Sequence, residues 1–241
     1  MRKRRKHSRL HKSTIALFAV AGVLLAGSAI GSTRAALTYY SDYYSAQLGT
    51  QEIGTALLEN GSDVTSEEGG VLLGDMQDMK IDLGKKYQEE LAVTNTGDID
   101  QYVRVRIYKS WTDKEGRKDP TLSPSYIDLN MNPQGGWLED EAAATAERSV
   151  WYYTKPLAPE EVTSLLTDTV RIDQQVASKV KTETEIVDGK QVTTTVYAYD
   201  GYTFHVKAEV DAVQNHNAAD AIKSAWGVDV TMDGNMIAAV E

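Results

Sequence analysis

Side chains suited to catalysis or metal binding are scarce in this chain. Histidine occurs twice within the first 12 residues and then only at His205 and His216, and cysteine does not occur. The sequence has no His-Glu-x-x-His zinc motif, no Gly-x-Ser-x-Gly nucleophile motif and no glycine-rich phosphate loop. His205 alternates with apolar residues and has charged neighbours on its own side, which is typical of a solvent-exposed strand face. We therefore predict no catalytic residues and interpret the protein as a non-enzyme.

Two groups of acidic residues could supply oxygen ligands to a calcium ion. They are Asp98 and Asp100 beside Asn95, and Asp113, Glu115 and Asp119 around Gly116. Neither group has the ligand spacing of a known calcium loop. The second group also fits a turn at the tip of a hairpin, where such residues are common. We favour solvated turns and predict no metal or cofactor, with calcium as the open alternative.

Alternating apolar and polar residues predict that the body of the chain is β-structure. In residues 102–108, Val103, Val105 and Ile107 share one face, which indicates a half-buried strand. Residues 90–94 predict another strand, which ends at an Asn-Thr-Gly turn. Residues 97–100 join it to the strand at 102–108. Further strands are predicted at residues 148–154, 167–172, 191–199 and 202–213.

The last two predicted strands flank Asp200-Gly201. Asp-Gly is favoured in tight type I′ turns, because both central residues of such a turn need positive φ. A similar turn is predicted upstream at residues 188–190. We therefore expect a three-stranded meander over residues 181–213.

One helix is predicted near the C-terminus, where Ala218, Ile222, Ala225 and Trp226 recur at helical spacing. Asn215 or Asn217 can cap its start, and Gly227 ends it. Residues 59–74 and 112–136 are interpreted as long loops. Together the elements predict a mainly β fold, a jelly-roll-like antiparallel β-sandwich with one or two short helices and long loops.

The N-terminal 35 residues have the pattern of an export signal. Residues 2–12 carry seven Lys or Arg and no acid, residues 14–30 are uncharged and mostly apolar, and small residues lead to Ala35. We predict a signal peptide at 1–35, cleaved between Ala35 and Ala36, and a single β-sandwich domain at 36–241. An uncleaved anchor is the alternative, although 17 apolar residues are at the lower limit for spanning a bilayer.

Cleavage leaves a strongly acidic protein. Residues 1–35 hold 8 of the 25 Lys and Arg and none of the 35 Asp and Glu, so the mature 206 residues carry 17 basic against 35 acidic residues, a net charge of −18. Nucleic acid and anionic membranes would repel such a chain. We predict a secreted protein with no nucleic-acid partner and no membrane association after cleavage.

Tyrosines are concentrated immediately after the predicted cleavage site. The residues that could form a strand there are Leu37, Tyr39, Tyr40, Tyr43, Tyr44, Ala46 and Leu48. This segment, residues 36–48, fits three interpretations: a carbohydrate-binding platform, a strand that pairs with a sheet edge after cleavage, or a first strand within its own sheet. The sequence leaves all three open.

The end of the signal and the start of the mature chain resemble those of the TasA/camelysin family of exported Gram-positive proteins with a SipW-type signal peptide. The residues that carry this resemblance are Ser32-Thr33-Arg34-Ala35 followed by Ala36-Leu37-Thr38-Tyr39-Tyr40-Ser41-Asp42-Tyr43-Tyr44. Residues 91–97 leading into 102–105 look like the strand–turn–strand core of that family. Shorter similar stretches lie at residues 136–138, 151–153 and 211–214.

The resemblance implies a secreted jelly-roll subunit that polymerises into fibres of a biofilm matrix or cell surface. It also implies processing by a SipW-type signal peptidase, and donation of residues 36–48 to the sheet of a neighbouring copy. The expected partners are the protein itself and an accessory or anchor subunit. Two alternatives remain, a camelysin-like metalloendopeptidase, which would have to use His205 and His216, and a surface adhesin.

Overall fold

The computed structural model describes residues 52–241 except 66–71, 77–78 and 188–189. The predicted signal peptide, the cleavage site at Ala35 and Ala36, and the candidate strand at 36–48 lie outside the described residues. The described part is mainly β, with antiparallel sheets and one α-helix. This confirms the predicted fold class.

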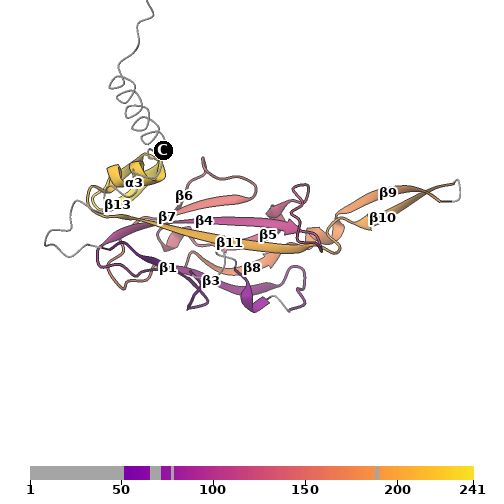
Figure 1. Cartoon of the computed structure of the whole chain (residues 1–241), viewed down its shortest axis with the longest axis horizontal. Coiled ribbons are helices and arrows are strands. Elements are labelled where there is room, and N and C mark those ends of the chain that lie inside the picture. The colour runs from indigo at the N-terminus through magenta and orange to yellow at the C-terminus, as the bar shows by residue number, and fades with distance from the viewer. Residues whose placement is uncertain (1–51, 66–71, 77–78, 188–189) are drawn as a thin grey trace, which may run out of the picture. The chain divides into compact units, whose positions relative to one another are not determined.

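Two larger sheets face each other in the described part of the chain (Figure 1). The first has the strand order β2-β1-β3-β8-β5, with β1 (Thr55–Glu59), β2 (Ser62–Asp63), β3 (Lys86–Asn95), β5 (Ile127–Met131) and β8 (Thr167–Ile172). The second has the order β11-β4-β7-β6, with β4 (Gln101–Thr112), β6 (Trp137–Glu139), β7 (Arg148–Tyr153) and β11 (Thr203–Gln214). The chain crosses repeatedly between the two sheets, as it does in a jelly roll.

Smaller elements complete the fold. Two-stranded ribbons are formed by β9 (Val180–Val187) with β10 (Lys190–Tyr197) and by β12 (Val230–Asp233) with β13 (Met236–Val240). The helix is α3 (Ala218–Trp226), and the short 3-10 helices are η1 (Gly74–Met76), η2 (Pro124–Tyr126), η3 (Pro133–Gly135) and η4 (Gln174–Ser178). None of the described helices is long and apolar enough to cross a membrane.

The core lies between the inner faces of the two sheets. Val103 and Val105 of β4 are fully buried against a cluster that includes Leu91 and Val93 of β3. The alternation predicted for residues 102–108 is therefore confirmed, and its apolar face is the inner face of the second sheet. Burial of these side chains is the main favourable term in folding.

The predicted Asn-Thr-Gly turn carries the chain from one sheet to the other. Asn95, only 1% exposed, donates from Nδ2 to the carbonyls of Ile99 and Leu157, both at 2.8 Å, and its Oδ1 accepts from Gly97 N–H at 2.8 Å. A Cβ on Gly97 would lie 2.3 Å from the Glu52 carbonyl oxygen, so only glycine fits there. β3 and β4 consequently belong to different sheets instead of forming a hairpin.

The predicted three-stranded meander is wrong. β10 pairs with β9, but β11 pairs along all of its 12 residues with β4. Asp200-Gly201 does form a turn, with Tyr202 N–H bonded to the Tyr199 carbonyl, but the turn is not of type I′, because Gly201 has positive φ (77°) and Asp200 does not. The chain changes sheets at this turn, where Tyr199 packs on Trp111 of β4 with ring centroids 4.8 Å apart and β11 begins to pair with β4.

The second predicted loop is also partly wrong, because residues 112–136 contain β5. Ile127 and Leu129 alternate into the core, and β5 forms an edge of the first sheet beside β8. The strand was missed because it is short and lies between the turn-forming Pro124 and Pro133. In residues 59–74 the structure has the two-residue strand β2 and the start of η1.

The predicted helix is confirmed as α3, with Asn217 at its N-cap and Gly227 at its C-cap with φ 75°. Ile222 is fully buried, whereas Ala225 is exposed, contrary to its predicted place on the apolar face. The helix and the β12–β13 ribbon form a second cluster with residues of β4 and β7. Its polar contacts include Tyr102 Oη donating to the Asn235 carbonyl at 2.7 Å.

Replacing Asn95 by alanine tests the crossover. Asn95→Ala leaves a Gly97 N–H and two carbonyls without their partner, so we expect a loss of about 2–4 kcal/mol in the free energy of unfolding. Urea denaturation measures the loss. The control is Asn130→Ala, because Asn130 is exposed and bonds only to the Asp168 side chain. Equal, small losses for both variants would contradict this assignment.

Candidate functional site: an apolar groove beside an edge strand

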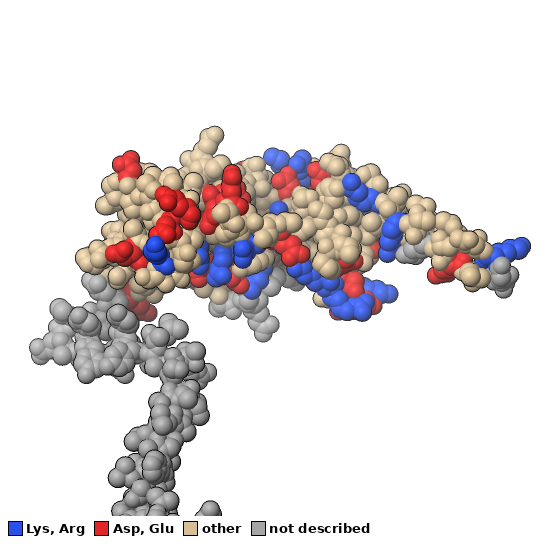
Figure 2. All heavy atoms as spheres, turned by 90° about the horizontal axis from the view of Figure 1, so that it is seen from above, with Lys and Arg blue, Asp and Glu red and all other residues tan. Residues whose placement is uncertain are grey.

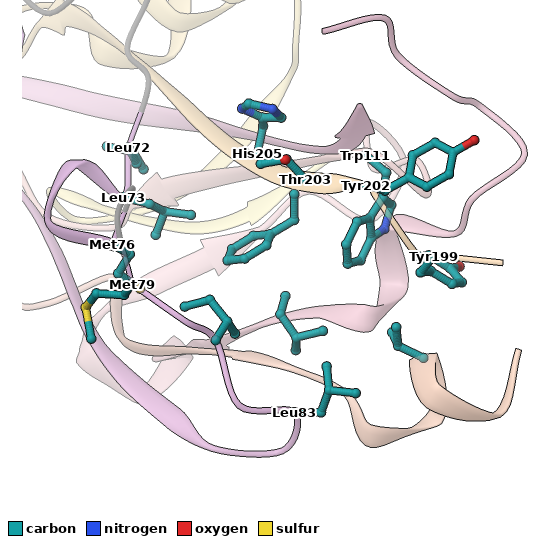
Figure 3. Close-up of a pocket in the computed structure, with 14 residues that line it drawn as sticks. Leu72, Leu73, Met76, Met79, Leu83, Trp111, Tyr199, Tyr202, Thr203 and His205 are labelled. Carbon is teal, nitrogen blue, oxygen red and sulfur yellow. The ribbon is translucent and has the colours of Figure 1, made fainter. Parts of the chain in front are cut away.

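An apolar groove of about 610 Å³ lies beside the start of β11 (Figure 3). Its lining comes from β11, from the end of β8 and η4, from Trp111 of β4, and from the segment that precedes β3. Figure 3 shows Leu72, Leu73, Met76 and Met79 along one side and Trp111, Tyr199 and Tyr202 along the other. Most lining side chains are aliphatic or aromatic, so the groove suits apolar side chains better than a charged ligand.

Hydrogen bonds hold the aromatic side of the groove in place. Trp111 Nε1 donates to the Ser123 carbonyl at 3.0 Å, and Ser123 N–H donates to Tyr199 Oη at 2.9 Å. Tyr202 Oη donates to Asp119 Oδ2 at 3.0 Å. The polar atoms of these rings are thus satisfied at the margin, and the rings present their apolar surfaces to the groove.

The opposite side is a bridging segment, residues 72–76, that connects the two sheets. Leu72 N–H donates to the Val206 carbonyl of β11 at 3.0 Å, and Leu73 N–H donates to Glu59 Oε1 of β1 at 2.5 Å. Leu72, Leu73 and Met76 are all buried. Leu73 has φ 72°, a left-handed conformation that is unfavourable for a branched side chain. The segment is therefore well packed but strained.

The strand beside the groove, β11, is an edge of the second sheet. It pairs with β4 on one side only. In an antiparallel pair, alternate residues direct both backbone groups away from the partner, and the Val206 carbonyl is one of these. Within the described residues, the bond from Leu72 is the one backbone hydrogen bond to this side of β11. A long edge of this kind is a template for another strand.

Glu89 of β3 is a buried acid near the bridging segment. Its side chain is 0% exposed, and no donor among the described residues reaches either carboxyl oxygen. Burial, the carboxylate of Glu59 on β1, a side-chain hydrogen bond with Glu59 and the carboxylate of Asp75 in η1 together raise the pKa of Glu89 to about 9, and burial is the largest cause. Glu89 is therefore neutral at pH 7. Glu59, which holds Leu73, and Glu89 belong to the same acidic cluster.

The two candidate histidines do not converge. His205 is exposed near the start of β11, with Nε2 2.8 Å from Thr112 Oγ1, and His216 lies beyond the other end of the 12-residue strand. Strand rise places them about 30 Å apart or more, too far to share a metal ion. In the described part of the chain, no group of three His, Asp or Glu side chains could hold one.

The acidic turns are occupied by their own hydrogen bonds. Asp113 Oδ1 accepts from the N–H groups of Glu115 and Arg117, and hydrogen bonds from the Arg117 backbone are the first cause that lowers the pKa of Asp113. Asp119 Oδ1 accepts from Thr121, and Asp98 Oδ1 from Glu52 N–H. Residues 113–117 thus form the predicted turn.

Comparisons of the chain with protein-family models, with curated proteins and with solved structures give no match. The resemblance to the TasA/camelysin family therefore stays a prediction from the sequence.

The sequence interpretation missed the groove. Residues 59–74 were assigned to a loop, and residues 75–83 were assigned to no element. A signal was available, because Leu72, Leu73, Met76, Ile81 and Leu83 are more apolar than a solvated loop requires. Such residues indicate a segment that packs on the core.

Because Glu89 has a raised pKa in the folded protein, we expect the free energy of unfolding to fall as pH rises. The unfolded chain ionises this carboxyl near pH 4.5 and the folded chain near pH 9, so its contribution is fully present below pH 4.5 and is lost progressively up to pH 9. The slope reaches up to about 1.4 kcal/mol per pH unit within that window. Urea denaturation at pH 5, 7 and 9 measures it.

The variant Glu89→Gln removes the ionisation and flattens the dependence, so its stability relative to the parent is greatest at pH 9. The matched control is Glu141→Gln, at an exposed position. Parallel pH curves for the parent and Glu89→Gln would show that Glu89 is not the titrating group.

Proposed function

We propose that this protein is a secreted structural subunit that polymerises into extracellular matrix fibres. In the fibre, residues 36–48 of one copy pair with the free edge of β11 in the next copy. The observation that carries this proposal is the combination of a 12-residue edge strand with an apolar groove beside it. An added strand would gain main-chain hydrogen bonds from the edge and side-chain burial from the groove.

The donated segment has the composition that this site requires. In an extended chain, Leu37, Tyr39 and Tyr43 lie on one face, and Tyr40 and Tyr44 on the other. One face can enter the groove while the other covers it. Large apolar and aromatic side chains give the greatest burial per residue.

The incoming strand takes the place of residues 72–76 on the edge of β11 and packs against the opposite wall of the groove, which Trp111, Tyr199 and Tyr202 form. In the described part of the chain, residues 72–76 occupy the edge of β11 through one backbone hydrogen bond, whereas a paired strand makes several. The left-handed backbone conformation of Leu73 lowers the cost of releasing the segment. Release of the segment is therefore the step that we expect to limit assembly.

Assembly of this kind propagates and is controlled by export. The donated strand and the accepting edge are different surfaces, so each added copy presents a new edge and the contact does not close on itself. Cleavage by a SipW-type signal peptidase would free the strand at Ala36. An accessory or anchor subunit that offers the same strand or edge could start or end a fibre.

A truncation tests strand donation. Mature protein that begins at Ala36 is expected to form regular fibres in negative-stain electron microscopy, with and without calcium. Protein that begins at Glu52 keeps the described domain but lacks the strand, so it is expected to remain monomeric in sedimentation velocity. Fibres from the truncated chain would refute donation by residues 36–48. Persistent monomers of the longer chain would refute polymerisation itself.

A charged side chain in the groove tests the accepting site. Leu83 lines the groove and is 38% exposed, so Leu83→Lys alters the surface with little effect on folding. We expect fibre elongation to slow at least about tenfold, because a desolvated ammonium costs more than 1.4 kcal/mol. Val162→Lys is the control, since Val162 is 47% exposed and lies outside the groove. Equal elongation rates for the two variants would contradict the groove as acceptor.

A further inference from the structure

The β9–β10 ribbon, called the arm below, extends beyond the sandwich as two strands with no third strand beside them (Figure 1). Its eight residue pairs run from Val180 opposite Tyr197 to Val187 opposite Lys190. Nearly all of its described side chains are exposed. An isolated two-stranded ribbon is marginally stable in water, so an arm of this length is expected to gain stability from a partner.

The two faces of the arm differ sharply in charge. Directly opposite residues share a face, and one face contains no Lys, Arg, His, Asp or Glu: Val180, Thr182, Thr184, Ile186, Gln191, Thr193, Thr195 and Tyr197. We call this the neutral face. Thr184 Oγ1 lies 3.5 Å from Thr193 Oγ1, which confirms that the two threonines share a side. Lys181, Glu185 and Lys190 belong to the other face by the same alternation.

The neutral face also carries the most exposed apolar side chains of the arm. Ile186 is 80% exposed, Tyr197 62% and Val180 55%. In Figure 2 the arm is mostly tan, with charged atoms at its tip and along one side. The chain carries a net charge of −10 with its signal and −18 without it, so two copies repel each other. A face without charges is the least costly contact between them, because it brings no carboxylates together.

We propose that the neutral face of the arm is a self-association surface that docks face to face on the arm of a second copy. The pattern of side chains is self-complementary about a two-fold axis that crosses the arm at its middle. The apolar tip at Ile186 then lies over the apolar base at Val180 of the second copy. The threonine rows meet in the centre, where hydroxyls can bond to one another.

The contact is too small to hold two free monomers together. Eight residues of strand and two strands give a face about 27 Å by 10 Å, so docking buries on the order of 500–600 Å² in total, below the range of stable complexes. Along two fibres the same contact repeats many times, and each docked arm raises the effective concentration of the next, so the summed contacts can hold the fibres together. The arm therefore joins fibres laterally into bundles, a role that goes beyond the proposed strand donation.

Single cysteines test the contact, since the natural chain has none. Mature Thr184→Cys protein is treated with a short homobifunctional maleimide, at high concentration and after fibre assembly. The matched control is Thr194→Cys, the same change on the opposite face of the same arm. In docked arms the two Thr184 residues are about 7 Å apart along the strands, whereas both ribbons lie between the two Thr194 residues. We therefore expect the yield of cross-linked dimer to be at least about fivefold higher for Thr184→Cys. Equal yields, or none at either position, would overturn the proposal.

Charge exchange tests the register. Ile186→Lys and Val180→Glu are each expected to abolish bundling and leave single fibres intact, while a mixture of the two restores bundles through Lys–Glu contacts. The control Val192→Glu lies on the other face and should bundle normally. Bundles that survive Ile186→Lys alone would overturn the arm contact. Cross-linking without any fibres would refute strand donation only, and fibres without cross-linking would refute the arm contact only.

Discussion

The pairing of β11 with β4 is the constraint on which the rest of the structure depends. Both strands place apolar residues toward the first sheet, and Val105 and Val206 are fully buried there. On the outer face the same register aligns opposite charges, with Arg104 Nη2 2.8 Å from Asp211 Oδ2. Inner burial supplies most of the stabilisation, since partly exposed ion pairs contribute little. The ion pairs help to specify the register, because a shift of one residue would reverse both faces.

This pairing has two consequences for the surface. Among the described residues, β11 has one long edge without a partner strand, and the groove forms where Trp111 and Tyr199 meet beside it. β9 and β10 are also excluded from the second sheet and remain a separate ribbon. Soluble monomeric proteins usually protect such edges and faces. Here the bridging segment covers part of the edge, and the neutral face of the arm stays open, which is the arrangement we associate with assembly.

In the assembly that we propose, the bridging segment links stability to strand acceptance. Leu72 and Leu73 bury apolar surface, but Leu73 adopts an unfavourable backbone conformation, and its N–H donates to Glu59 beside the buried Glu89. Local strain concentrates where a structure must rearrange. Under the proposed function, such a segment would protect the edge of β11 in the monomer and release it to a strand from another copy.

Local features were predictable from the sequence alone. The faces of β4 and β11, the ends of α3 and the turn at Asn95 follow from alternation, caps and turn residues, all of which act over a few neighbouring positions. The strong acidity of the chain also follows directly from its composition. Only the tertiary structure decided which strands pair with one another and which side chains lie together. The separation of β3 from β4, the missed β5, the edge position of β11 and the acid environment of Glu89 depend on residues that are far apart in the chain. A local pattern does not specify which of several similar strands pair, because the stable pairing is the one that buries the most apolar surface in the whole fold.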